Sequence, residues 1–288
     1  MNIGDKIRSL RTAKLMTQSE LAGSEITRNM LSRIENGAAQ PSLDTLRYIA
    51  KKLNVSPGFL LADGGDEQIY IKHNEIHGIK TSYLMGDYRI CRDMCINSES
   101  AEDDEVRLIL AECTLEIAIE EFSRGNLRVA CEYFDMAIDA CAGTIYNTGH
   151  ISSIAVMYFK YMRSLSATLS SNSVDESEMS AWAALSHSFC AYAGAFLALS
   201  DGEDVSVYPI SSGIYGLHID AIKSIKDGNF ASAYESLHKI LVSDELVPEP
   251  MMYFVFCDLE VACKQTGDFK GAYEYSISKM ELLQKLLS

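Results

Sequence analysis

Three stretches near the N-terminus decide the fold of the first part of this chain: TQSELA at 17–22, TRNMLSRIENG at 27–37 and PSLDTLRYIAKKLNVSPGFLL at 41–61. In the first, Thr17 and Glu20 have the spacing at which each side chain caps the backbone N–H of the other, so a short helix is predicted to begin there. In the second, Thr27 is the predicted cap, and Asn36 followed by Gly37 is a typical helix end. Two short helices joined by a tight turn are therefore predicted.

Apolar residues at helical spacing extend this pattern in both directions. Ahead of the three stretches they predict a first helix over about residues 3–14, with these residues on its apolar side: Ile3, Ile7, Leu10 and Leu15. The third stretch predicts a fourth helix that opens at Pro41 and buries a second apolar set: Leu43, Leu46, Ile49 and Ala50. A fifth element carries Val55, Phe59 and Leu60. A small all-α domain of five helices is therefore predicted over residues 1–65.

These motifs together resemble the lambda-repressor-type (XRE family) helix-turn-helix domain over residues 3–62. The resemblance implies that the second helix lies across the DNA backbone and that the third enters the major groove. It places Gln18 on a phosphate and points four side chains of the third helix toward base edges: Arg28, Asn29, Ser32 and Arg33. Arginine can bind guanine through two hydrogen bonds, and asparagine can do the same with adenine. Three further residues are expected to position the DNA backbone: Thr27, Asn36 and Arg47.

One departure from the family pattern concerns the turn before the third helix. The segment GSEI at 23–26 is slightly shorter than the usual turn, so the register of the reading helix is open at this point. Two other interpretations of the domain also stay open. In the first, Arg28 and Arg33 are solvated surface residues with no role in DNA binding. In the second, the domain keeps its fold only for dimer or partner contacts.

Charge is distributed unevenly along the chain. The formal net charge is -15, which by itself counts against nucleic-acid binding. Residues 1–62, however, carry nine Lys and Arg against five Asp and Glu, whereas the rest of the chain carries 16 against 35. This asymmetry is typical of a protein in which one end meets DNA and the remainder avoids it.

An internal repeat organises the rest of the chain, after a Gly-rich and acidic linker at 62–68. Four segments share Gly, then Asp or Asn, an apolar residue, two variable residues and a small residue: GDYRIC at 86–91, GNLRVA at 125–130, GNFASA at 228–233 and GDFKGA at 267–272. The first two segments are 39 residues apart, as are the last two, and the middle spacing is 103 residues. Regular spacing of this length indicates stacked helical repeats.

The shared motif resembles the turn between the two helices of a tetratricopeptide repeat. It implies a repeat domain over residues 66–288 that consists of about five helical hairpins: 68–98, 103–142, 150–199, 206–243 and 249–287. The third hairpin lacks the turn motif. Such hairpins stack into a right-handed superhelix with a concave face.

The combination of the two domains resembles the RRNPP group of Gram-positive quorum-sensing regulators, which includes the Rgg and PlcR types. The resemblance implies that the concave groove binds a short linear signalling peptide and that the repeat domain forms a homodimer, which would bind a palindromic operator in double-stranded DNA. The aromatic and His residues expected in the groove are Phe122, Tyr158, Tyr161, His187, Tyr215, His218 and Phe254.

Several function classes are disfavoured by the sequence. No phosphate-binding loop, dinucleotide turn, zinc-protease helix or nucleophile elbow occurs, so we expect no catalytic residues, no cofactor and no enzyme activity. The eight cysteines form no C-x-x-C pair and are expected to be free thiols rather than metal ligands. No signal peptide and no long apolar run is found, so a cytoplasmic protein without membrane contact is expected. Two rival functions stay open: a scaffold that binds a partner protein, and a phage-type repressor whose repeats only dimerise.

Overall fold

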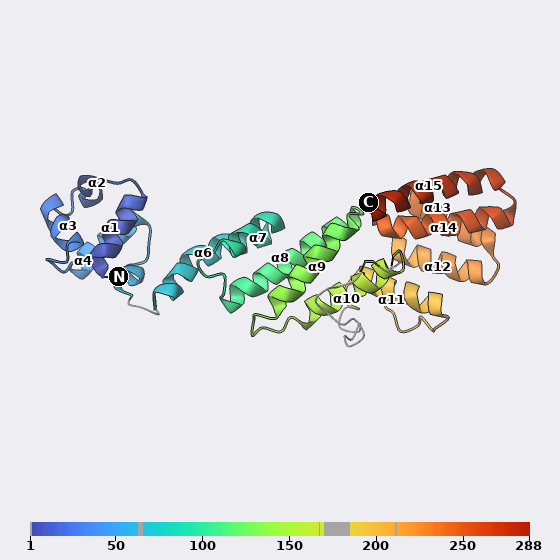
Figure 1. Cartoon of the computed structure of the whole chain (residues 1–288), viewed down its shortest axis with the longest axis horizontal. Coiled ribbons are helices and arrows are strands. Elements are labelled where there is room, and N and C mark those ends of the chain that lie inside the picture. The colour runs from blue at the N-terminus through green and yellow to red at the C-terminus, as the bar shows by residue number, and fades with distance from the viewer. Residues whose placement is uncertain (1, 63–65, 167, 170–184, 211) are drawn as a thin grey trace. The chain divides into compact units, whose positions relative to one another are not determined.

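The computed structural model describes the chain apart from residues 1, 63–65, 167, 170–184 and 211, and every regular element in the described part is a helix (Figure 1). The first five helices are α1 (Ile3–Ala13), α2 (Gln18–Ala22), α3 (Arg28–Glu35), α4 (Leu43–Leu53) and α5 (Pro57–Leu61). The other ten helices of the described residues follow in pairs: α6 (Asp66–Leu84) and α7 (Tyr88–Ile96), α8 (Asp104–Ser123) and α9 (Leu127–Cys141), α10 (Gly149–Arg163) and α11 (Ser188–Asp201), α12 (Ile214–Lys226) and α13 (Phe230–Leu241), α14 (Glu249–Thr266) and α15 (Phe269–Leu287). The predicted all-α class, five helices followed by five helix pairs, is confirmed.

The chain divides into two compact units. The first consists of residues 1–85 and 94–101, and the second of residues 86–93 and 102–288. The first unit thus extends past residue 65 and includes α6. Gly58 of α5 lies so close to the ring of Tyr70 in α6 that a Cβ atom on this glycine would overlap the ring. Helix α6 is therefore attached directly to the five-helix domain.

Helix boundaries in the first unit follow the predicted caps. The side chain of Thr17 accepts from the backbone N–H of Glu20 while the Glu20 carboxylate accepts from that of Thr17, so the predicted capping box is present. Thr27 accepts from the N–H of Met30 at the start of α3. Asn36 is the C-cap of that helix, and Gly37 follows with a φ of 70°. These local signals were sufficient because each cap involves residues three positions apart.

Three details of the first unit differ from the prediction. Helix α4 begins after the cap residue Ser42, whose hydroxyl accepts from the N–H of Thr45, and not at Pro41. Leu43 is 64% exposed and Leu15 is 92% exposed, so neither belongs to the core. Leu15 lies beyond the end of α1 with a φ of 56°, and this backbone turn directs its side chain away from the apolar face of the helix.

A buried lysine joins the two ends of the five-helix domain. The ammonium group of Lys6 in α1 donates to the carbonyl oxygen of Phe59 at 3.1 Å and to that of Ala62 at 2.6 Å. Both carbonyls lie at the C-terminal end of α5, where a positive charge is favoured by the helix dipole. Lys6 therefore fixes the end of α5 against α1, immediately before residues 63–65.

The repeat motif forms the predicted turns. Its four glycines all have φ between 77° and 84°, a conformation that glycine adopts at little cost: Gly86, Gly125, Gly228 and Gly267. The small residue that ends each motif is buried in every copy: Cys91, Ala130, Ala233 and Ala272. The glycine permits the reversal of the chain, and the small residue permits close packing of the two helices.

One predicted boundary in the repeat region is wrong, and the third hairpin has an unusually long connection. The fourth hairpin was expected to begin near residue 206, but α12 begins at Ile214 after the segment 203–213, which is not helical in its described residues. The third hairpin joins α10 to α11 through residues 164–187, part of which lies outside the described residues. This long connection explains why the short glycine turn motif is absent from that copy.

Hairpins two to five pack around one another in the second unit. Helix α8 contacts both α10 and α14, and α15 contacts α9, so the fifth hairpin returns to the second (Figure 1). Arg128 of α9, for example, donates to the carbonyl oxygen of Leu287 at 3.4 Å. This arrangement encloses a large apolar core between the hairpins.

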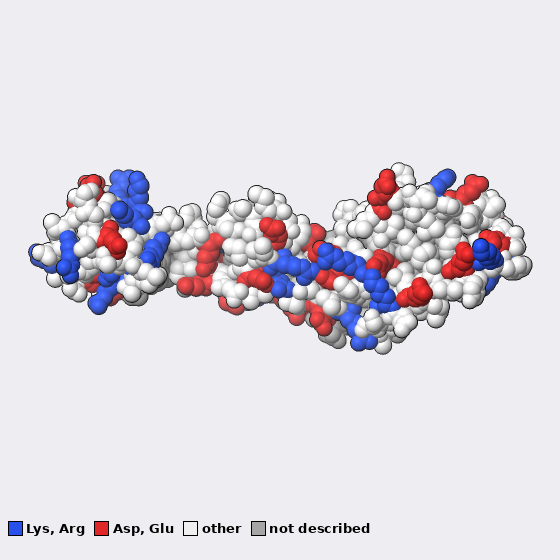
Figure 2. Space-filling view, turned by 90° about the horizontal axis from the view of Figure 1, so that it is seen from above, with Lys and Arg blue, Asp and Glu red and all other residues white. Residues whose placement is uncertain are grey.

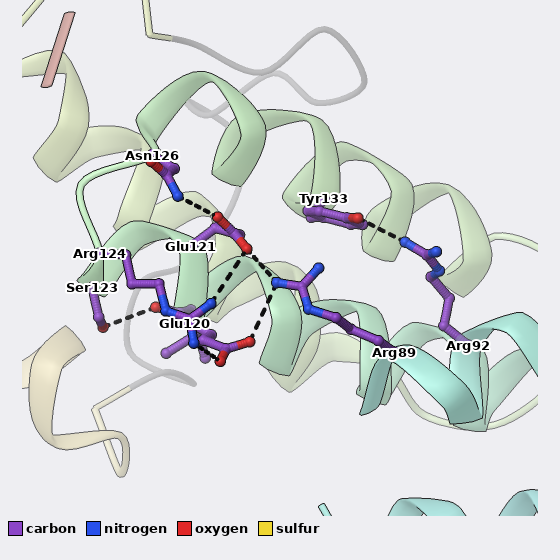
Figure 3. A network of polar contacts seen from close by, with 9 residues as sticks. Arg89, Arg92, Glu120, Glu121, Ser123, Arg124, Asn126 and Tyr133 are labelled. Atoms are coloured by element: carbon purple, nitrogen blue, oxygen red, sulfur yellow. Dashed lines mark hydrogen bonds and ion pairs between the residues drawn. The ribbon is translucent and has the colours of Figure 1, made fainter. Parts of the chain in front are cut away.

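A polar network attaches the start of α7 to the second hairpin. Glu121 of α8 is its centre and accepts from Arg89 and, at 2.7 Å, from the amide of Asn126 (Figure 3). Burial alone would raise the pKa of the Glu121 carboxyl, but these hydrogen bonds and the charge of Arg89 hold it below its ordinary value. Arg92 of α7 donates to the hydroxyl of Tyr133 in α9 at 2.7 Å. Two arginines one turn apart thus bind α7 to both α8 and α9.

Candidate functional site

The outer face of α3 is the first candidate site. Successive residues of a helix are about 100° apart, so four residues share one side of α3: Arg28, Asn29, Ser32 and Arg33. The opposite side buries Leu31 and Ile34 in the domain core. Arg28, Asn29 and Arg33 are exposed, and none of their three side chains has a hydrogen bond or ion pair to another described residue. Their polar groups are thus available to a partner outside the domain.

A buried ion pair fixes α3 against α1 and α2. The side chain of Glu35 is 1% exposed and accepts from Nε of Arg11 at 2.7 Å, from its Nη2 at 3.1 Å and from Nε2 of Gln18 at 2.8 Å. Burial would raise the pKa of the Glu35 carboxyl, but the hydrogen bonds from Arg11 and Gln18 hold it below its ordinary value. Gln18 was expected to contact a phosphate. The network was not predicted, because its three members are far apart in sequence.

The turn between α2 and α3 is closed by an aromatic side chain. Gly23 has a φ of 53°, and a Cβ atom there would overlap the hydroxyl of Tyr48. That hydroxyl donates to the carbonyl oxygen of Ala22 at 3.0 Å, which ties the end of α2 to α4. The short segment 23–26 therefore still joins two helices, because glycine at position 23 allows Tyr48 to approach the backbone.

An aromatic cluster between the hairpins of the second unit is the second candidate site. Phe122 of α8 contacts Tyr158 and Tyr161 of α10, with ring centroids 4.7 and 6.1 Å apart. Tyr161 in turn contacts Phe254 of α14 at 5.7 Å, and Tyr158 contacts the ring of His187 at 6.0 Å. The cluster therefore joins side chains from the second, third and fifth hairpins.

Tyr192 of α11 connects the remaining members. Its ring stacks on that of Tyr215 in α12 with centroids 5.0 Å apart. Its hydroxyl lies 3.2 Å from the hydroxyl of Tyr161 and 2.8 Å from Nδ1 of His218, whose Nε2 lies 3.1 Å from a carboxylate oxygen of Asp258 in α14. A hydrogen-bonded chain thus runs through the cluster from α10 to α14. Burial raises the pKa values of Tyr161 and Tyr192, so both hydroxyls stay protonated.

The N-terminal unit matches a known family. A protein-family model described as helix-turn-helix matches residues 7–60. Residues 7–60 form a helix-turn-helix domain. No curated protein sequence matches the chain.

Two solved structures are similar to nearly the whole chain. The crystal structure of Bacillus thuringiensis PlcR in complex with the peptide PapR7 and DNA is 14% identical, with 99% of this chain and 96% of that chain covered and a TM-score of 0.27. The Streptococcus dysgalactiae SHP pheromone receptor Rgg2 is 12% identical, with coverages of 96% and 98% and a TM-score of 0.22. TM-scores this low do not establish a shared arrangement of helices, so neither likeness supports a functional conclusion.

The residues expected to position a DNA backbone are also at the surface of the helix-turn-helix domain. Thr27 and Asn36 are exposed at the two ends of α3, and Arg47 is exposed on α4. Several Lys and Arg side chains project from this unit on the face seen in Figure 2.

The seven residues predicted for a peptide groove all belong to the aromatic cluster, but four of them do not line an open groove. Phe122, Tyr158, Tyr161 and His218 are each 2% exposed or less. The physical reason is the return of the fifth hairpin to the second, which fills the expected concave face with packed rings. Three residues stay partly exposed at the edge of the cluster: His187, Tyr215 and Phe254.

No group of three or more His, Cys, Asp or Glu side chains is placed to hold a metal ion in the part of the chain that the structure describes. The described helices include none whose length and apolar character would let it cross a membrane. All eight cysteines are free thiols.

Proposed function

We propose that this chain is a transcription regulator whose helix-turn-helix domain binds double-stranded DNA in a sequence-specific manner through α3, and whose repeat region binds a short linear peptide and forms a homodimer. The observation that carries the DNA-binding part is the outer face of α3. Its Arg28, Asn29 and Arg33 side chains are exposed and have no partner among the described residues, whereas Arg11 and Glu35 beneath them are paired. Unpaired Arg and Asn donors on a rigid helix are suited to base edges in the major groove.

The test of DNA binding uses the purified full chain and fragments of its own upstream region, over a salt series. Arg33→Ala is expected to weaken specific binding by about 1–3 kcal/mol and to relax sequence preference at one position. Arg33→Lys is the matched control, because it keeps the positive charge and loses the two-pronged hydrogen bond. It is expected to restore the salt dependence but not the preference. If Arg33→Ala leaves affinity and preference unchanged, α3 is not the reading helix.

Gln18→Ala tests the role of α2 separately. Gln18 is half-exposed and is oriented by Glu35, so its loss is expected to weaken binding to specific and unrelated DNA alike. A change confined to one sequence would instead assign Gln18 to base recognition.

Support for peptide binding comes from the aromatic cluster. Partly exposed rings of Tyr215 and Phe254 border it, and Nδ1 of His187 is buried without a hydrogen-bond partner in the described residues. A buried nitrogen without a partner is costly, and a backbone N–H of a ligand would satisfy it. Because the centre of the cluster is packed, a peptide that enters it must displace helices of the neighbouring hairpins.

The corresponding experiment measures DNA binding with and without the peptide fraction of the culture medium. A shift in affinity supports peptide sensing, and His187→Phe is expected to reduce the shift. Specific binding that ignores the fraction would favour the rival function of a repressor whose repeats only dimerise. The close packing of Phe122, Tyr158 and Tyr161 is the observation that favours this rival.

A further inference from the structure

The outer face of α15 carries an uncharged stripe. Phe269, Tyr273, Ile277 and Met280 are 73%, 68%, 41% and 58% exposed, and they recur at intervals of three or four residues. At about 100° per residue these positions lie on one side of the helix, together with Ser276, Gln284 and Leu287. No charged residue occurs among these seven. A helix face without charge and with four exposed large side chains is unusual on a protein surface and indicates a partner.

The stripe is also hollowed. A shallow, open groove of about 790 Å³ follows it and is lined by residues of α15 from Tyr273 to Leu287 and by the cap residue Ser288. The other side of the helix is packed on the protein, because Ala272 and Leu286 are buried and Tyr275 stacks on Phe256 of α14. The groove therefore lies on the face of α15 that points away from α14, where a second helix can be accommodated.

The stripe is complementary to itself when two copies run antiparallel. A two-fold axis close to Ile277 places Tyr273 of one copy opposite Met280 of the other, and it places the two Ile277 side chains near the axis. Antiparallel helices also have opposed dipoles, which favours this orientation over the parallel one. One helix face thus supplies both sides of the contact, as an isologous interface requires.

Charges beside the stripe favour the same register. Lys270 and Glu281 lie on one flank of α15, about 60° and 80° from the Tyr273 direction at 100° per residue. In an antiparallel pair this flank meets the same flank of the second copy, so Lys270 of each copy comes within reach of Glu281 of the other. Within one copy, Lys270 has only the exposed contact with Glu274 at 3.6 Å, and Glu281 has no partner among the described residues. Glu281 is therefore available for a cross-pair, and Lys270 can exchange its exposed contact with Glu274 for one.

We propose that α15 is the contact surface for a second copy of this chain, and that the two α15 helices pair antiparallel with Lys270 of each opposite Glu281 of the other. This inference deepens the homodimer of the proposed function by naming the face and its register. The occupant is a second copy because the flank charges and the apolar positions match their own two-fold image.

The test is the monomer-dimer equilibrium of the full chain, measured by sedimentation over a concentration series. Met280→Glu is expected to raise the dissociation constant by at least about 30-fold, because each copy then places a carboxylate in the apolar centre. The matched control is Leu246→Glu, an 82% exposed residue outside α15, which is expected to leave the constant unchanged. Circular dichroism checks that both variants keep the helical content of the parent.

A charge exchange tests the register. Lys270→Glu and Glu281→Lys are each expected to raise the dissociation constant by about 3- to 10-fold at low salt, since each change places like charges opposite one another. The double variant is expected to return to within about 2-fold of the parent, because both cross-pairs are restored with reversed sign.

The dissociation constants of these variants distinguish the antiparallel register, the α15 surface and the homodimer from one another. Recovery in the double variant together with loss in Met280→Glu supports the inference. Loss in Met280→Glu without recovery overturns the antiparallel register. A dimer that Met280→Glu leaves intact overturns the α15 surface while the proposed homodimer stands, and a parent chain that is monomeric at every concentration overturns both.

Discussion

Neutralising Glu35 is the sharpest perturbation of the helix-turn-helix domain. The substitution Glu35→Gln keeps the shape of the side chain but removes the negative charge opposite Arg11, whose side chain is 14% exposed. Arg11 then keeps a hydrogen-bond acceptor without a counter-charge. Leaving one member of a buried ion pair uncompensated costs about 3–5 kcal/mol, and the hydrogen bond that glutamine can still accept places the expected loss near the lower limit, about 3 kcal/mol.

Hydrogen exchange on the full chain measures this loss locally. A decrease of about 3 kcal/mol in the free energy of opening accelerates exchange of the α3 amides roughly 150-fold when opening and closing are fast. Peptides from α12 to α15 serve as the internal control and are expected to be unchanged, because they lie in the other compact unit. Acceleration below about 5-fold would refute the assignment of Glu35 as the buried counter-charge.

A double variant separates charge from packing. Arg11→Met combined with Glu35→Leu removes both charges and keeps apolar volume, so it is expected to cost less than Glu35→Gln alone. A double variant that costs more would show that hydrogen bonding, and not charge compensation, dominates at this site.

The pH dependence of the stability that Glu35 contributes has a defined sign. The folded-state pKa of Glu35 is lowered, so its contribution is present above the ordinary glutamate pKa and is lost as pH falls through the lower folded-state value.

Three further substitutions test other parts of the fold. Lys6→Met leaves two carbonyl groups at the end of α5 without their donor and is expected to destabilise the domain by about 2–3 kcal/mol, measured as faster amide exchange in α5. Tyr192→Phe removes the central hydroxyl of the buried chain and is expected to cost about 2 kcal/mol in thermal unfolding of the full chain, whereas the exposed Tyr146→Phe is expected to cost nothing measurable. Gly58→Ala forces a methyl group against Tyr70 and is expected to cost about 1–3 kcal/mol, with faster exchange in residues 69–84; unchanged exchange would contradict the α5 to α6 contact.

Local features of this fold could be predicted from the sequence. The caps at Thr17 and Thr27 and the glycine turns of the repeat involve residues within a few positions of one another, and their signals do not depend on the rest of the chain. The residues of the α3 face were named from the resemblance to the lambda-repressor-type domain, and the predicted ends of the helix agree with it. Local hydrogen bonds and local steric limits therefore determined what could be predicted.

The missed features depend on contacts between distant residues. Glu35 is an unremarkable charged residue in the sequence, and its burial follows only from the positions of Arg11 and Gln18 after folding. Lys6 pairs with carbonyls more than 50 residues away. Leu15 has the spacing of a core residue, but the backbone leaves the helix before it. Periodicity assumes a continuous helix and cannot show where that assumption ends.

The aromatic cluster shows the same limit at the level of hairpins. Four of the residues predicted for the groove, Phe122, Tyr158, Tyr161 and Phe254, lie on inner helix faces, because all four contact one another or shared neighbours. Whether an inner face borders a groove or a closed core depends on the path of the whole array. Here α14 returns to α8, and the rings fill the space. Whether the inner faces form a groove or a core therefore depends on contacts between hairpins that are more than a hundred residues apart in sequence.

The close packing of the aromatic cluster limits which peptides could bind between the hairpins. A ligand that enters between the hairpins must replace the ring contacts it breaks, because it can shift the packing only by its greater affinity for the opened form. Each large aromatic side chain buried in such a core contributes about 1.5–3 kcal/mol, so a small polar ligand cannot compensate for the separation of several rings. Peptides with aromatic or large aliphatic side chains, and a backbone N–H for His187, satisfy both demands. The packing and the polar groups of the aromatic cluster therefore restrict the side chains that a peptide ligand can carry.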